Sequence, residues 1–294
     1  MRDPEYDRFG PWILVISEKD PLPPLFVARI KRSDTPLLAI KIPRQVDRRD
    51  AWPGMDLYDY VLCMYEKGFD VYKRDGRDVA TESIPYEDIV CIRQGENLLA
   101  GVITLFRKDS AFEFAYNTVS SDIITKVVGL IRERYTGEMQ SFESEGAVPQ
   151  EKQLDFYFSN LARQERERNP DNILLAFQPR VHFRGLKEGR LRKIMHVLTS
   201  KVLLESLHYC DGRELKIITR GQDFKYLEQP VYGVECRYIP VRNLKSVGMV
   251  ERAAHSALVI RQIKTDGAGF SVYFSPENPT AYNYGELERR YCRA

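Results

Sequence analysis

Apolar and polar residues alternate over short stretches in the first half of the chain, a pattern that predicts half-buried β-strands. Residues 112–116 are the plainest case, because an aromatic side chain occupies every second position there. Glu66-Lys67-Gly68 and Asp75-Gly76 are typical of the tight turns that join such strands. We therefore predict seven strands, at 37–42, 59–65, 69–73, 79–84, 89–93, 98–106 and 111–116.

The period of the apolar residues changes after residue 117 and becomes helical, which predicts a helix with one apolar stripe. Asn117 or Ser121 is suited to cap this helix. An apolar stripe must pack on an apolar surface, and an antiparallel sheet is the surface that the preceding strands offer. The stripe consists of Ile123, Val127, Leu130, Ile131 and Tyr135.

Several short motifs of the first half recur in the second half in the same order. Pro43-Arg44 returns as Pro179-Arg180, an offset of 136 residues. Ile84-Pro85 returns as Ile239-Pro240, an offset of 155, so we expect 19 extra residues in the second copy, around 220–231. The chain is therefore predicted to contain one fold twice. Further matches are Arg48 with Arg184, Val61-Leu62 with Val197-Leu198, Asp75-Gly76-Arg77 with Asp211-Gly212-Arg213, and Arg134-Tyr135 with Arg290-Tyr291.

The remaining segments complete the predicted domain organisation. Two strands at 257–263 and 270–274 precede a helix that Asn278-Pro279 begins, with Tyr284, Leu287 and Tyr291 along one side. Residues 136–150 read as a linker, and 151–168 as a connecting helix that packs through Leu154, Phe158 and Leu161. The predicted organisation is an N-terminal extension at 1–36 that forms a hairpin from 12–16 and 25–30, a first copy at 37–135, a linker with a connecting helix at 136–172, and a second copy at 173–294.

About seven antiparallel strands followed by one C-terminal helix, within about 100 residues, resemble the pleckstrin-homology-like domain. Residues 84–89 and 239–247 are similar to a stretch common in bacterial members of that family. The resemblance covers roughly 215 of the 294 residues. It implies an α+β, mainly β fold: two such domains, each about seven antiparallel strands in a sandwich or open barrel capped by a C-terminal helix.

Both copies place the pattern Pro-Arg-x-x-x-Arg directly after their first strand. In the family that it resembles, this first inter-strand loop binds phosphoinositide head groups, and guanidinium groups suit phosphate because they donate two parallel hydrogen bonds. An alternative is that an arginine at a strand end pairs with a neighbouring carboxylate. The resemblance implies a ligand site in the second copy at Arg180, Arg184, Lys187, Arg190, Arg192 and Lys193, with a weaker counterpart in the first copy at Arg44, Arg48 and Arg49, where Asp47, Asp50 and Asp56 lie nearby.

No motif of a hydrolase, nucleotide-binding loop or metal site occurs in the sequence. The four histidines are not spaced as metal ligands, and we expect His182 and His208 to share a strand surface without a role. The five cysteines suit reduced thiols, with Cys63 and Cys91 in the core. We therefore expect a protein that is not an enzyme and that needs no cofactor and no metal.

The net charge of +2 is an average over unlike parts of the chain. Residues 37–135 carry 14 Lys+Arg and 16 Asp+Glu, whereas residues 173–293 carry 20 and 12. No apolar run approaches the ~20 residues of a membrane helix and no secretory signal is evident, so we expect a cytoplasmic protein, with peripheral membrane contact as an alternative.

These observations favour a non-catalytic scaffold that binds a protein or peptide partner, for example by strand addition to an exposed sheet edge. The alternative is a peripheral binder of anionic lipid head groups or another polyanion, through the basic loop of the second copy. An enzyme without a recognisable motif is the third reading. We expect no specific nucleic-acid partner, and a homodimer formed through an exposed strand edge stays open.

Overall fold

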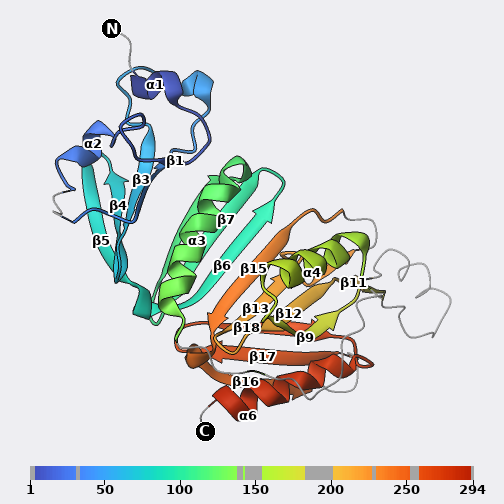
Figure 1. The fold of residues 1–294 in the computed structure, drawn as a ribbon. Coiled ribbons are helices and arrows are strands. Elements are labelled where there is room, and N and C mark those ends of the chain that lie inside the picture. The colour runs from blue at the N-terminus through green and yellow to red at the C-terminus, as the bar shows by residue number, and fades with distance from the viewer. Residues whose placement is uncertain are drawn as a thin grey trace. The chain divides into compact units, whose positions relative to one another are not determined.

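A computed structural model describes residues 4–30, 34–137, 142, 154–182, 201–226, 230–251 and 258–292. The fold is mainly β, with antiparallel sheets and a few helices, as predicted (Figure 1). The chain divides into two compact units. Unit 1 comprises Met1–Ile89, Leu99–Ile103 and Glu113–Tyr135, and unit 2 comprises Val90–Leu98, Thr104–Phe112 and Thr136–Ala294.

Unit 1 contains a five-stranded antiparallel sheet in the order β1-β2-β3-β4-β5. Phe9, Phe26 and Tyr58 are among the buried side chains that form its core. Gly76, with φ of 60°, makes the tight turn from β4 to β5. The strands are β1 (Leu14–Val15), β2 (Leu38–Pro43), β3 (Tyr58–Met64), β4 (Gly68–Asp75) and β5 (Asp78–Pro85), with helices α1 (Pro4–Arg8), α2 (Pro24–Val27) and η1 (Arg48–Asp50).

The N-terminal extension differs from the predicted hairpin. Residues 14–15 form β1, which pairs with β2 and so adds a strand to the main sheet. Residues 24–27 form α2 instead of the second hairpin strand. Pro24 at the first turn favours this helix, and the buried Phe26 ring holds it on the core. The prediction failed because an apolar run of this length is compatible with either structure.

Three strands and a helix follow β5 along the chain. The alternation predicted for residues 112–116 is confirmed, since Phe112, Phe114 and Tyr116 are buried and the residues between them are exposed. The Asn117 side chain accepts a hydrogen bond from the Val119 backbone N–H and begins the helical segment. The elements are η2 (Tyr86–Asp88), β6 (Ile89–Asn97), β7 (Ala100–Arg107), β8 (Ala111–Asn117), η3 (Thr118–Ser120) and α3 (Ser121–Tyr135).

Unit 2 is built around the antiparallel strands β9, β12, β13 and β15, which are neighbours in that order. Within the same unit, residues 234–238 of β15 pair with residues 92–96 of β6. The full order of this sheet is β8-β7-β6-β15-β13-β12-β9, and the division into units passes through β6, β7 and β8. The strands are β9 (Ile173–Gln178), β12 (Ser206–Cys210), β13 (Glu214–Thr219) and β15 (Val234–Pro240).

Two three-stranded sheets and further helical segments complete the described part of unit 2. One small sheet has the order β10-β11-β14 and the other has the order β16-β17-β18. Figure 1 shows α6 beside β16, in agreement with their contacts. The elements are α4 (Phe156–Arg168), β10 (Val181–His182), β11 (Lys201–Leu203), β14 (Phe224–Tyr226), η5 (Val241–Asn243), β16 (Leu244–Glu251), β17 (Val259–Thr265), β18 (Gly269–Phe274), η6 (Pro279–Asn283) and α6 (Tyr284–Tyr291).

The predicted connecting helix is α4, which packs on unit 2 through the residues that the pattern marked. Leu154 and Phe158 are buried in a cluster against Leu207, and Leu161 lies at its margin. Asp155 caps the helix by accepting a hydrogen bond from the Phe158 backbone N–H at 2.8 Å.

The order of elements in the first series, from β2 to α3, recurs in the second series, from β9 to α6. In each series four strands that are neighbours in one sheet (β2, β3, β4 and β5 in the first, and β9, β12, β13 and β15 in the second) precede a 3₁₀ turn, three further strands, another 3₁₀ turn and a helix. The second series also contains β10, β11 and β14, which form a separate small sheet, and the first contains η1 between β2 and β3. η2 follows Pro85 and η5 follows Pro240, which agrees with the offset of 155. Asn278 caps η6 through the Thr280 backbone N–H, as Asn117 caps η3.

The offset of 136 does not hold beyond the first strand. Asp75-Gly76-Arg77 joins β4 to β5, the third and fourth strands in the order β2-β3-β4-β5. Asp211-Gly212-Arg213 instead joins β12 to β13, the second and third strands in the order β9-β12-β13-β15. The extra residues therefore fall in two places, between β9 and β12 and between β13 and β15. Tight-turn residues favour any chain reversal, so this motif occurs at two different turns. Arg184 and residues 197–198 lie outside the described residues.

Candidate functional site

The strand β16 lies at the edge of its sheet, and β17 is the strand that pairs with it among the described residues. Leu244 and Val247 point into the core of unit 2, where they are buried. Met249 and Val250 are exposed to 40% and 37%. An edge strand presents backbone N–H and C=O groups that can pair with another strand, so β16 combines hydrogen-bonding groups with apolar surface.

The helix α6 lies beside this edge and is fixed by its buried side chains. Tyr284 and Leu287 have no exposed surface and belong to the core of unit 2. After the helix, the Cys292 thiol accepts a hydrogen bond from the Val247 backbone N–H. We define the β16 edge as residues 247–251 together with this neighbouring end of α6.

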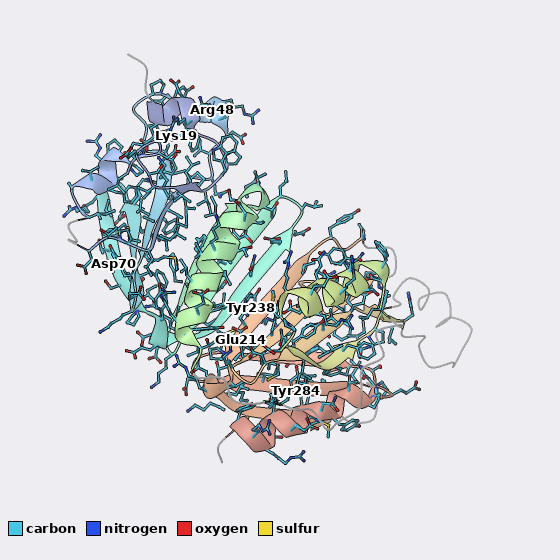
Figure 2. The ribbon with its side chains drawn as sticks, in the orientation of Figure 1. Lys19, Arg48, Asp70, Glu214, Tyr238 and Tyr284 are labelled. Atoms are coloured by element: carbon cyan, nitrogen blue, oxygen red, sulfur yellow. The ribbon has the colours of Figure 1, made fainter. Side chains whose placement is uncertain are left out.

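A buried histidine connects α6 to the sheet. His208 Nδ1 lies 2.5 Å from the Tyr284 hydroxyl, and its Nε2 lies 2.7 Å from Ser206 Oγ (Tyr284 is labelled in Figure 2). Burial, with a smaller effect of the Arg237 charge, lowers the pKa of His208 to about 3. The imidazole is therefore neutral at neutral pH and acts as a donor to one hydroxyl and an acceptor for the other.

The sequence-based placement of His208 on a strand surface is wrong. All five residues of β12 are buried, because α4 covers one face of this strand and the core with α6 covers the other. The Ser206–His208 distance resembles a nucleophile–base pair. Full burial of the imidazole keeps it from any solvent-borne substrate, so the arrangement holds α6 in place. His182 is exposed in β10.

Arg180 is the one described member of the basic loop in the second series, and it is neutralised. Its Nε lies 2.8 Å from Glu205, a carboxylate with no exposed surface, and its Nη2 lies 3.4 Å from Asp155. Arg220 pairs with Asp155 at 2.6 Å and stacks over the Tyr157 ring at 4.7 Å. Of the two interpretations given for an arginine at this strand end, phosphate binding or pairing with a carboxylate, the structure shows the second for Arg180. Arg184, Lys187, Arg190, Arg192 and Lys193 lie outside the described residues.

The arginines of the first series are engaged by groups of their own unit. Arg44 lies 3.8 Å from Asp59 and donates a hydrogen bond to the Asp56 carbonyl at 3.0 Å. Arg48 lies over the Tyr6 ring at 4.1 Å and bonds to backbone oxygens beside α1 (Figure 2). Arg49 is exposed and pairs with Asp47 at 2.8 Å and Asp50 at 3.9 Å.

The two series place similar charges at the ends of their first three strands. In the first, Asp59 is shared by Arg44 and Arg74, the latter at 2.7 Å. In the second, Glu205 lies near both Arg180 and Arg220. A carboxylate between two arginines supplies the charge-assisted hydrogen bonds that a phosphate would otherwise supply. These positions therefore stabilise the sheet ends.

Unit 1 also contains a pocket that was not predicted, although residues 84–87 of the stretch that resembles the family line part of it. Its volume is about 540 Å³, and it is lined by the ends of β4, β5 and α3. Asp70, labelled in Figure 2, is buried there and accepts a hydrogen bond from Ser83 Oγ at 2.6 Å. Arg134 on its rim pairs with Glu66 at 3.3 Å. The pocket joins three segments far apart along the chain, which is why spacing along the sequence does not reveal it.

Comparisons with known proteins do not assign the chain to a family. No protein-family model matches the chain, and no curated protein sequence matches it. Among the residues that the structure describes, no helix is both long and apolar enough to cross a membrane. The same residues contain no group of three or more His, Cys, Asp or Glu side chains placed to hold a metal ion.

Proposed function

We propose that this protein is a non-catalytic binding protein built from two pleckstrin-homology-like domains, and that it takes an extended segment of a protein or peptide partner on the β16 edge. The observation that carries the proposal is a difference between the two series. β6 and β16 occupy the same place in the element order, and β6 has β15 on its outer side, whereas β16 ends its sheet in the described part of the chain.

The recurring element order supports the domain assignment. About seven antiparallel strands followed by a C-terminal helix are the plan expected from the resemblance. The first series has seven strands and a helix, and the second has the same order of elements with β10, β11 and β14 in addition. The two 3₁₀ turns after Pro85 and Pro240, and the two Asn caps, support a common origin of the series.

Strand addition to β16 would draw on two sources of binding free energy. Backbone hydrogen bonds give affinity without a strict sequence requirement, and pockets for alternate side chains give specificity. Met249 and Val250 would lose exposed apolar surface to the partner. Peptides with apolar residues at alternate positions are therefore the expected ligands.

A phage-displayed library of random ten-residue peptides tests this proposal. Enriched peptides should bind the wild-type chain and lose binding to Met249→Pro, which lacks one edge N–H. Met249→Ala is the matched control, because it shortens the side chain and keeps the N–H, and it should retain part of the affinity. Enrichment of nothing, or equal binding to Met249→Pro, would overturn the proposal.

A second function is favoured by the charge of the second series. Residues 173–293 carry 20 Lys+Arg against 12 Asp+Glu, and six of the basic residues fall within the segment 180–193. We propose as the alternative that this segment binds anionic lipid head groups or another polyanion. Co-sedimentation with phosphatidylserine vesicles, compared with phosphatidylcholine vesicles, tests it. Equal binding to both, or no loss when Arg190 and Arg192 become Ala, would exclude this function.

A further inference from the structure

We propose that the partner strand for the β16 edge is β5 of a second molecule of this protein, so that molecules associate head to tail. The inference rests on the proposed function and names its partner. β5 and β15 are both the last strand before the 3₁₀ turn that follows Pro85 or Pro240, and β6 and β16 are both the first strand after that turn. β15 already pairs with β6, while β5 and β16 each end a sheet in the described part of the chain.

The pairing of β15 with β6 provides a template for the register. In this pairing Cys236 lies opposite Gln94, and Tyr238 lies opposite Ile92. The 3₁₀ turns after Pro85 and Pro240 align the two series at an offset of 155 in this region. Applied to β5 and β16, the template pairs Val79 with Glu251, Thr81 with Met249, and Ser83 with Val247.

The direction of the backbone groups fits this register. A two-residue turn, Gly76-Arg77, joins β4 to β5, so Asp75 and Asp78 form the hydrogen-bonded pair that closes the hairpin. Hydrogen-bonded and non-hydrogen-bonded pairs then alternate along the strands, which directs the N–H groups of Thr81 and Ser83 away from β4. Pro85 agrees with this alternation, since it falls in a non-hydrogen-bonded pair and has no N–H to lose.

Exposure and charge also suit a contact between these two strands. Residues 80–83 of β5 are all exposed, as are Met249 and Val250 of β16. Residues 37–135, which contain β5, have an excess of two negative charges, whereas residues 173–293, which contain β16, have an excess of eight positive charges. Opposite charge favours the association of unlike ends over that of two β16 ends.

The Val247 backbone N–H shows in which direction the hydrogen-bonding groups of this part of β16 point. An added strand must also replace the acceptor that this N–H already has. The N–H donates to the Cys292 thiol, so it points toward α6 and away from β17. A thiol is a weak acceptor, and a carbonyl of an added strand would replace it at this position. Replacing Cys292 by Ala should therefore strengthen the association.

Sedimentation velocity over a range of protein concentrations tests the proposal, because a head-to-tail contact continues into rings or longer chains. Thr81→Pro removes an edge N–H from β5, and Met249→Pro removes one from β16. Each variant alone should lose self-association at least about tenfold. An equimolar mixture should form dimers and nothing larger, because each molecule keeps one intact edge. Thr81→Val and Met249→Leu, which keep the N–H groups, should associate as the wild type does.

A cross-linking experiment tests the same contact without the proline variants, so it still applies if one of them does not fold. A mixture of Thr81→Cys and Met249→Cys molecules should yield an intermolecular disulfide between these positions, identified by mass spectrometry. Thr81→Cys mixed with Lys264→Cys, an exposed site on β17, is the control and should yield none.

The outcomes separate this inference from the proposed function. A wild-type chain that stays monomeric, together with no disulfide between positions 81 and 249 of the two cysteine variants, would overturn the inference, while library peptides that depend on Met249 would leave the proposed function standing. Self-association that survives Thr81→Pro and is lost in Met249→Pro would mean that two β16 edges pair, which also overturns the inference. A wild-type chain that neither self-associates nor binds library peptides would overturn both proposals.

Discussion

The buried His208 makes a quantitative prediction about the pH dependence of stability. The imidazole has a pKa of about 3 in the folded protein because burial disfavours its charged form, whereas in the unfolded chain it has the ordinary value of about 6.5. A histidine whose pKa is lowered by folding contributes stability above its unfolded pKa. This contribution is lost as the pH falls from about 6.5 toward 3, because the unfolded chain binds the proton first.

The size of the effect follows from the two pKa values. Between pH 7.5 and pH 5 the free energy of unfolding should fall by about 2 kcal/mol from this group alone, and by a further ~1.4 kcal/mol per pH unit below that. Carboxylates such as Glu165, whose pKa is lowered in the folded protein, add their own loss only as the pH approaches their unfolded pKa of about 4. Asp223, whose pKa burial raises, changes stability in the opposite direction as the pH falls, so the share of the histidine is the difference between the wild type and a variant that lacks the imidazole.

The measurement must report on unit 2, and the buried Cys210 thiol, two residues from His208 in β12, does so. Urea-dependent labelling of Cys210, resolved by mass spectrometry, gives the free energy of unfolding at each pH. His208→Gln retains a polar side chain without the titration. It should flatten the dependence between pH 7.5 and 5, whatever its effect on stability at pH 7.5.

His182→Gln is the matched control. This histidine is exposed in β10, so its replacement is the same chemical exchange made outside the contact between His208 and Tyr284. A change in pH dependence that both variants share would not come from the buried imidazole. An imidazole resonance of His208 that titrates near pH 6.5 in the folded protein would refute the reasoning. So would equal slopes in wild type and His208→Gln.

Three further predictions concern stability. Glu165 is buried with Lys216 and accepts hydrogen bonds from Asn169 and Asn172, so Glu165→Leu should lower the free energy of unfolding by about 3–5 kcal/mol. The double variant with Lys216→Met should recover most of this in urea titrations, and a double variant no more stable than the single one would argue against an ion pair. At Gly101 an added Cβ would overlap the Tyr116 ring, whereas at Gly95 it would meet nothing within 4 Å. Gly101→Ala should therefore cost about 1–3 kcal/mol, seen as a lower Tm, with Gly95→Ala as the control; equal Tm values would contradict the packing argument. Arg180→Ala removes one partner of the buried Glu205 and should cost roughly 1–3 kcal/mol, whereas the exposed Arg49→Ala should cost less than about 0.5 kcal/mol. If the two arginine variants unfold at the same urea concentration, the Glu205 contact contributes nothing.

Much of the local structure could be predicted from periodicity and turn chemistry. Each of the seven strands predicted in the first series has its counterpart from β2 to β8, and the stripe that includes Ile131 and Tyr135 belongs to α3. Asn117 and Asn278 cap helical segments as expected. These features depend on interactions between residues a few positions apart, which is why spacing along the chain is enough to predict them.

The candidate site was much less accessible to prediction. Sequence reasoning pointed to the arginine loops. In the structure Arg180 pairs with Glu205 and Asp155, and Arg44 pairs with Asp59. Residues 244–251, which form β16, were not among the predicted strands, and the family-like stretch at 239–247 does not mark them as a sheet edge. An alternation of apolar residues predicts that a strand exists, but its position within the sheet depends on which other strands compete for its backbone groups.

The sequence by itself determined that this chain is mainly β, where the strands of the first series turn, and that Asn117 and Asn278 begin helical segments. Only the tertiary structure decided that β15 pairs with β6, that the Asp-Gly-Arg motifs occupy different turns, and that His208 is buried between two covered faces of the sheet. The physical reason is that turn and helix preferences act between neighbours, whereas strand pairing and burial join residues far apart in sequence. Their free energy depends on every segment that packs around them.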